Sequence, residues 1–114
     1  MLIPQRVPLA AAMDLLLTGD AIDARRAAQL GLVSRVVDDG TALDVALGIA
    51  ARIAANAPLA VRVTKQIARV ALDWTGPDAW DRCLELTEPV AHSHDAHEGA
   101  VAFAEKRAPV WQGR

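Results

Sequence analysis

Only one stretch of this 114-residue sequence has the pattern of a β-strand. Residues 32–37 (LVSRVV) alternate and are rich in β-branched side chains, and they lie between Gly31 and a turn sequence at residues 38–40. A single strand has no neighbour to complete its ladder of backbone hydrogen bonds. The stretch therefore either pairs with something outside this chain or forms an extended connection with only local partners.

Helical patterns fill most of the remaining sequence. Alanine is the commonest residue, tyrosine is absent and phenylalanine occurs once, a composition that favours helix over sheet. Pro89 should kink or end the fifth helix, because proline cannot donate a helical hydrogen bond. The predicted helices begin and end near residues 8–17, 24–30, 41–56, 58–72, 77–89 and 94–107.

Polar residues before several of these helices are predicted caps, and periodicity predicts which helix faces are inward. Asp23 and Thr41 should cap the second and third helices, and Ser93 or Asp95 the last. The helix over residues 41–56 is apolar on most sides and should be largely buried. The last helix is predicted to point Ala96, Ala100, Phe103 and Ala104 inward, and Glu98, Glu105, Lys106 and Arg107 outward.

The charge and hydropathy patterns exclude several classes of partner. Twelve basic and fourteen acidic side chains give a net charge of -2, so no overall positive field attracts nucleic acid. Charged residues interrupt every apolar stretch before it reaches the length of a membrane span, and the N-terminus lacks the pattern of a secretion signal. Cys83 has no second cysteine to pair with, which favours a cytoplasmic location.

Two clusters of polar side chains are candidate binding sites. His92, His94 and His97 resemble a zinc-binding cluster, but they also lie where the last helix begins. A solvated first helical turn is the favoured interpretation, and no metal site is assigned. Arg62, Lys65 and Arg69 are spaced so that they lie on one face of a helix, and this basic series could contact phosphates. The favoured interpretation is a solvent-facing stripe.

The sequence contains none of the short motifs that carry phosphate binding or nucleophilic catalysis. The patterns G-x-G-x-x-G, G-x-x-x-x-G-K and G-x-S-x-G are absent. Glutamate is missing until Glu85, and the later glutamates occupy positions expected to be exposed. No general acid and base are assembled, so the residues themselves assign no catalytic group.

Four stretches, in order, resemble the C-terminal part of the enoyl-CoA hydratase/isomerase, or crotonase, family. The resemblance covers residues 1–114. Its motifs are IPQRVP and AMDLLLTG at residues 3–8 and 12–19, AAQLGLVSRVV at 27–37, IAANAPLAVRVTK at 53–65, and HDAHEG followed by FAEKRAPVW at 94–99 and 103–111.

This resemblance implies a mainly α chain: a short strand-helix unit and the C-terminal helices of the α/β crotonase (ClpP/crotonase-like) fold, without the N-terminal spiral core. Residues 1–40 would then be the end of that core (helix, short helix, short strand). Residues 41–114 would be a helical region for oligomerisation or for covering the active site. Members of the family act on acyl-CoA thioesters and assemble as trimers or hexamers, so a homo-oligomer without nucleic acid or membrane is implied.

The resemblance assigns one ligand contact and no catalytic residue. The family's oxyanion hole and catalytic glutamates would fall before Met1, and no cofactor is implied beyond coenzyme A as part of the substrate. Lys106 matches a lysine that in some relatives approaches the nucleotide portion of CoA from a neighbouring subunit. The alternative for Lys106 is that it complements the negative end of the last helix.

Two hypotheses of function follow, and they differ in whether the chain is part of an enzyme. The favoured one is a C-terminal fragment of an acyl-CoA enzyme that is inactive alone. The alternative is a noncatalytic helical module for oligomerisation or interaction. Which acyl-CoA is used, and whether the reaction is hydration, isomerisation, dehalogenation or hydrolysis, depends on residues outside this sequence.

Overall fold

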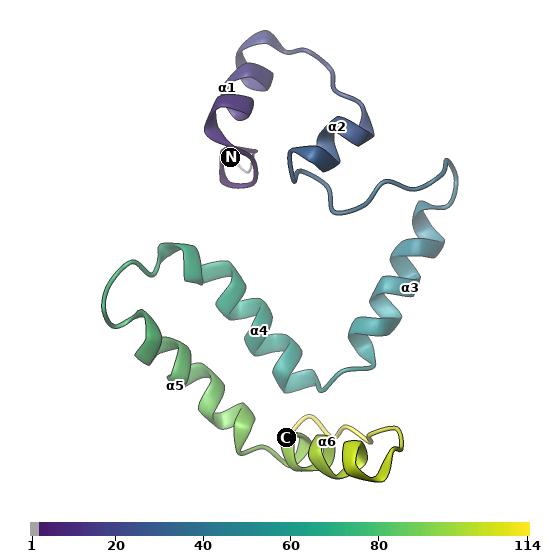
Figure 1. The fold of residues 1–114 in the computed structure, drawn as a ribbon, viewed down its shortest axis with the longest axis vertical. Coiled ribbons are helices and arrows are strands. Elements are labelled where there is room, and N and C mark those ends of the chain that lie inside the picture. The colour runs from purple at the N-terminus through teal and green to yellow at the C-terminus, as the bar shows by residue number, and fades with distance from the viewer. Residues whose placement is uncertain (1–2) are drawn as a thin grey trace. The chain divides into compact units, whose positions relative to one another are not determined.

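The computed structural model describes residues 3–114, and all of the regular structure in that range is helical (Figure 1). The mainly α prediction is therefore confirmed. The chain divides into two compact units, residues 1–45 and 46–114, with the division inside helix α3. The elements are η1 (Ile3–Gln5), α1 (Leu9–Thr18), α2 (Ala24–Gln29), α3 (Ala42–Ala54), α4 (Pro58–Val70), η2 (Ala71–Asp73), α5 (Ala79–Ala91) and α6 (His94–Glu105).

Local capping signals set the bounds of the two helices in the first unit. Helix α1 ends at Gly19, whose left-handed conformation (φ 72°) lets its N–H reach the carbonyl oxygen of Leu15 at 3.2 Å. Helix α2 begins after Asp23, whose carboxylate accepts the backbone N–H of Arg26 at 2.7 Å. Both helices therefore lie where the sequence predicted them. The buried apolar side chains of this unit are Val7, Ala12 and Ala27.

The strand predicted at residues 32–37 does not form, and that expectation is wrong for this chain. The segment has bends at residues 32–34 and irregular structure at residues 35–37, and residues 32–36 are exposed. Its first N–H, on Leu32, bonds locally to the carbonyl oxygen of Ala27 at 2.9 Å. A strand needs a neighbouring strand, and residues 3–114 provide none. The alternative, an extended connection with local partners, describes what is observed.

Helix α3 forms as expected but is not buried. Leu43 is 68% exposed and Leu47 is 58% exposed, and no residue of α3 is buried. The prediction of a largely buried helix is wrong here because nothing among the described residues covers its apolar face. Thr41 also differs from its predicted role, since its hydroxyl donates to the carbonyl oxygen of Asp38 at 2.7 Å.

Helices α4 and α5 form an antiparallel pair that packs along much of its length (Figure 1). Pro58 occupies the first turn of α4, where a missing N–H is harmless. The apolar series Leu59, Val63, Ile67 and Val70 is half-buried, as its spacing predicts. Pro89 does not end α5, which continues to Ala91. Pro89 lies in the last turn of α5, so its missing N–H removes only one helical hydrogen bond, close to the end of the helix.

Helix α6 has the predicted start and the opposite inward face. The hydroxyl of Ser93 accepts the N–H of Ala96 at 3.0 Å, so Ser93 is the N-cap. Phe103, expected inward, is 88% exposed, whereas Asp95 and Ala102 are buried. The C-terminal residues 109–114 run back along α6 and pack on the face that contains Asp95 (Figure 1). This packing by the end of the chain decides which face is inward.

No single helix within residues 3–114 combines the length and apolar character needed to cross a membrane. Helix α3 and residues 58–73 meet those criteria only when taken together, and they are bent by 112° at the break between them.

Candidate functional site

Lys106 stands at the C-terminal end of α6 in an unusual backbone conformation. Its φ of 55° and ψ of 38° are left-handed, and within residues 3–114 it is the only residue other than glycine with a positive φ. The next N–H, on Arg107, bonds to the carbonyl oxygen of Ala102 at 3.0 Å, which closes the helix end. The lysine is thus held at a fixed corner where the chain leaves the helix.

Arg107, the neighbouring cation, is fully engaged by two carboxylates. Its guanidinium bonds to both oxygens of Glu98, at 2.6 and 3.0 Å, and its Nε donates to Glu105 at 2.6 Å. Glu98 also accepts the N–H of Val110 at 2.7 Å. The hydrogen bonds from Arg107 and Val110 lower the pKa of Glu98 from 4.5 to about 2. The Glu98 and Glu105 hydrogen bonds raise the pKa of Arg107 above its already high ordinary value.

The Glu98 side chain therefore bonds to the turn that follows α6, which corrects its expected position on the outward face. Its side chain is only 14% exposed. Lys106, by contrast, is exposed and forms no ion pair with any residue in the range 3–114. Of the two adjacent cations, Lys106 is the one left available for an external anion.

Phe103 adds an exposed aromatic ring one helical turn before Lys106. The two residues are joined through the backbone, where the Lys106 N–H bonds to the Phe103 carbonyl oxygen at 3.2 Å. An aromatic face can stack on a base, and an ammonium group can contact a phosphate. The periodicity of the sequence placed this ring inward, so Phe103 was not a candidate site residue there.

The C-terminal tail is fastened to α6 by a second carboxylate. Asp95 is 1% exposed, and its two oxygens accept the N–H groups of Gln112 and Gly113 at 2.7 and 2.9 Å. The Trp111 ring lies against Gly99, and its Nε1 donates to the carbonyl oxygen of Ala55 at 2.7 Å. Asp95 is therefore not the cap of α6, the alternative to Ser93 that the sequence offers, but binds the tail.

The signal for this arrangement is present in the sequence at positions 95, 98, 99 and 102. They follow the i, i+3, i+4, i+7 spacing of one helix face, but two of them are acidic and one is glycine. An apolar pattern search therefore passes over this face. The glycine is informative, because a Cβ at Gly99 would lie 3.3 Å from the Trp111 ring.

The three histidines do not form a metal-binding cluster in the described part of the structure. His92, His94 and His97 are all exposed. Within the described part of the chain, no group of three or more His, Cys, Asp or Glu side chains is arranged to hold a metal ion. The expectation that the protein holds no metal stays a prediction.

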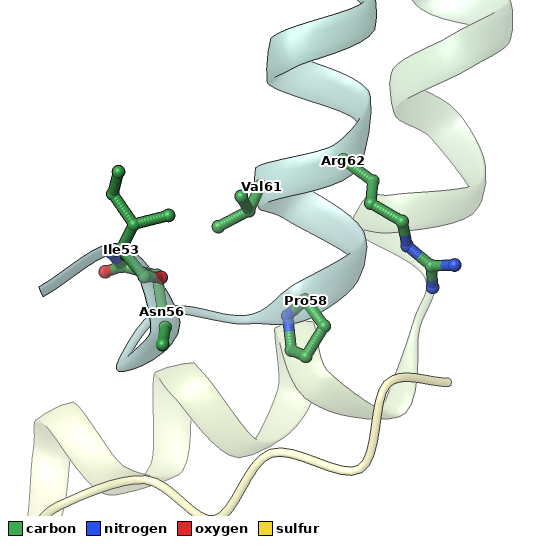
Figure 2. A pocket seen from close by; sticks show the side chains of 6 residues that line it. Ile53, Asn56, Pro58, Val61 and Arg62 are labelled. Atoms are coloured by element: carbon green, nitrogen blue, oxygen red, sulfur yellow. Dashed lines mark hydrogen bonds between the residues drawn. The ribbon is translucent and has the colours of Figure 1, made fainter. Parts of the chain in front are cut away.

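A hollow of about 330 Å³ lies where α3 gives way to α4 (Figure 2). Figure 2 shows Ile53 and Val61 facing each other across it, while the guanidinium of Arg62 extends away from both. Arg62 is the only charged residue of the lining, and it is an exposed member of the basic series with Lys65 and Arg69. The hollow has apolar walls and no acid or base with which to carry out a reaction. Its lining residues are Ile53, Ala54, Asn56, Pro58, Val61 and Arg62.

Comparison with known proteins gives a consistent set of relatives. The sequence model of a family described as enoyl-CoA hydratase/isomerase matches residues 1–114. The chain is 38% identical over 116 residues to a carnitinyl-CoA dehydratase of Proteus mirabilis, covering 98% of this chain and 44% of that protein. It is 43% identical over 110 residues to an enoyl-CoA hydratase of Mycobacterium tuberculosis, covering 96% and 41%.

Solved structures agree with the sequence matches. A probable enoyl-CoA hydratase/isomerase from Mycobacterium abscessus superposes with a TM-score of 0.90 at 51% identity, over 98% of this chain and 44% of that one. An enoyl-CoA hydratase from M. tuberculosis gives a TM-score of 0.93 at 47% identity, over 97% and 44%. The chain thus spans less than half the length of the relatives it matches.

Proposed function

The chain belongs to the enoyl-CoA hydratase/isomerase family, and from that premise we propose that it is the C-terminal helical part of an enzyme acting on acyl-CoA thioesters. In this proposal Lys106 binds a phosphate of the CoA nucleotide. The carbonyl-polarising groups and the catalytic acid and base are contributed by another part of the enzyme.

The observation that carries the ligand contact is that Lys106 is exposed and forms no ion pair within residues 3–114, one helical turn after the exposed Phe103. Arg107 is engaged by Glu98 and Glu105, so Lys106 is the cation that can meet a phosphate without first breaking an ion pair. The Phe103 ring, 88% exposed, offers a stacking surface for the adenine of the same nucleotide. A base and a phosphate would thus be recognised by adjacent side chains of one helix end.

The Lys106 contact is tested by replacing the cation and measuring nucleotide affinity. We expect Lys106→Met to weaken binding of adenosine 3′,5′-bisphosphate about tenfold, the equivalent of a charged hydrogen bond of roughly 1.5 kcal/mol. Lys65→Met removes an equally exposed lysine from α4 and is the matched control. Titrations followed by NMR give both affinities. Equal affinity of Lys106→Met and the wild type would exclude the contact.

We propose that the chain is catalytically inactive alone. The hollow beside Ile53 is lined by no carboxylate or histidine, and the carboxylates near Lys106, Glu98 and Glu105, are bonded to Arg107. We expect the purified chain to leave crotonyl-CoA unhydrated, as followed by the absorbance of its enoyl thioester. Turnover at ordinary hydratase rates would overturn this part of the proposal.

We also propose that the complete protein is a cytoplasmic trimer or hexamer in which Lys106 acts on a neighbouring subunit's ligand. The exposed apolar side chains of α1 and α3, including Leu9, Leu17 and Leu43, support burial against other protein. The same surfaces support the second candidate, a noncatalytic module for oligomerisation. Nucleotide binding that depends on Lys106 favours the enzyme part, whereas assembly without any CoA binding favours the module.

A further inference from the structure

We propose that Glu98 is a positioning residue that holds the turn after α6, so that Lys106 keeps its left-handed conformation and presents its ammonium to the phosphate. This inference rests on the proposed function of Lys106. It assigns a role to a carboxylate that touches neither the proposed ligand nor Lys106 itself.

The first step of the argument is where the bonds of Glu98 fall along the chain. Its carboxylate contacts Arg107 through two nitrogens, at 2.6 and 3.0 Å, and the Val110 N–H at 2.7 Å. These partners follow Lys106 by one and four residues. On the other side, the Lys106 N–H bonds to the Phe103 carbonyl oxygen at 3.2 Å. Lys106 is therefore bracketed between the helix end and a turn that Glu98 ties back to the helix at two residues, Arg107 and Val110.

The second step is that the conformation needs this support. A left-handed backbone is unfavourable for a residue with a Cβ, because the Cβ crowds the carbonyl oxygen. Released from the tie to Glu98, the turn can relax and carry the Lys106 side chain away from its present direction. Backbone bonds from Lys106 and Arg107 close the helix end, and the Asp95 bonds fasten the chain farther on, at Gln112 and Gly113. Among the described side chains, Glu98 is the one that ties Val110 back to the helix.

The third step is that charge and position predict opposite results when Glu98 loses its charge. Removing a negative charge close to a phosphate site strengthens anion binding if electrostatic attraction is all that matters. Removing a positioning residue weakens it. The direction of the change in affinity therefore separates the two effects.

The experiment measures the affinity of the 114-residue chain for adenosine 3′,5′-bisphosphate by NMR titration. We expect Glu98→Gln to weaken binding roughly three- to tenfold. Glu105→Gln is the matched control, since it also removes one carboxylate from Arg107 but leaves the Glu98 bonds in place; its affinity should be unchanged or tighter. The double variant Lys106→Met/Glu98→Gln should bind no more weakly than Lys106→Met.

A second readout follows the turn without any ligand. A positive φ brings the Lys106 amide proton close to its own Hα, giving a strong intraresidue NOE, which we expect Glu98→Gln to weaken. Arg107→Gln removes the other half of the ion pair and should weaken the same NOE if this ion pair holds the turn. Unchanged or tighter binding by Glu98→Gln, with the NOE retained, would overturn the inference while leaving the Lys106 contact intact. Failure of Lys106→Met to weaken binding would instead remove the proposed function and this inference with it.

Discussion

At the end of α6 a lysine occupies a position where glycine is the usual residue. Lys106 has a φ of 55°, and the bonds that surround it are those of a helix end closed by a left-handed residue. A side chain kept in an unfavourable conformation points to a use for that side chain. Here that use and the stability of the turn make opposite demands on one residue.

This conflict predicts that Lys106→Gly stabilises the fold while weakening nucleotide binding. Glycine avoids a conformational cost of about 1–2 kcal/mol but adds entropy to the unfolded chain, for a net gain of about 0.5–1 kcal/mol. Urea unfolding followed by tryptophan fluorescence measures it, since Trp74, Trp80 and Trp111 all lie in the second unit. Lys106→Ala keeps the Cβ and should show no such gain. A glycine variant less stable than the wild type would contradict the prediction.

A second prediction at this scale concerns the pH dependence of Glu98. Its pKa is about 2 in the folded chain against an ordinary 4.5, so the folded state favours the charged form. Its stabilising contribution is present above pH 4.5 and is lost as the pH falls from 4.5 toward 2. NMR titration of the Val110 amide should report this low midpoint, and Glu98→Gln should abolish the step. A midpoint near 4.5 would show that the turn is not tied as described.

At the scale of the elements, helix bounds follow local chemistry, whereas helix faces do not. Asp23, Ser93 and Gly19 occupy the cap positions that their side chains or lack of one favour. Phe103 shows the limit of periodicity, because the tail covers the face that carries Asp95 rather than the more apolar one. Carboxylates that bind backbone N–H groups made the polar face the inward one.

The cap of α6 gives the prediction for this scale. Ser93→Ala removes the hydroxyl that accepts the Ala96 N–H, and it should cost about 1 kcal/mol of unfolding free energy. Ser34→Ala is the matched control, since Ser34 is exposed in the segment after α2 and caps no helix. Urea unfolding followed by circular dichroism measures both variants. An equal loss of unfolding free energy in the two variants would show that the Ser93 cap adds no stability beyond that of an exposed serine.

At the scale of the whole molecule, the main fact is how little apolar surface is buried. The buried apolar side chains among the described residues are Val7, Ala12, Ala27 and Ala102, while long side chains such as Leu43 stay exposed. Surfaces of this kind associate in water. The sequence predicted that these apolar helix faces form a core, but in the described residues no other apolar surface covers them.

This exposure predicts that the purified chain self-associates. Its weight-average mass in sedimentation experiments should rise with protein concentration, because association removes the apolar face of α3 from water. Leu47→Gln should reduce the association. Leu72→Gln is the control, because Leu72 is 83% exposed but lies in η2, away from that face. A monomer at every concentration would contradict the prediction.

The sequence by itself determined where the helices lie and which family the chain resembles. Helical hydrogen bonds and caps connect residues within about four positions of each other, and a proline acts on its immediate neighbours. Short motifs such as the one around Pro58 therefore contain all the residues that set a helix boundary. The resemblance also named Lys106 as a candidate ligand contact, and that role stays a prediction.

Only the tertiary structure decided which side chains face inward and how the Lys106 corner is held. The partners of Asp95 lie 17 and 18 residues away, and Trp111 reaches Ala55 across 56 residues. The stretch at residues 32–37 remained irregular because a strand exists only beside another strand. Burial and pairing are properties of two surfaces brought together, and a periodic pattern describes only one of them.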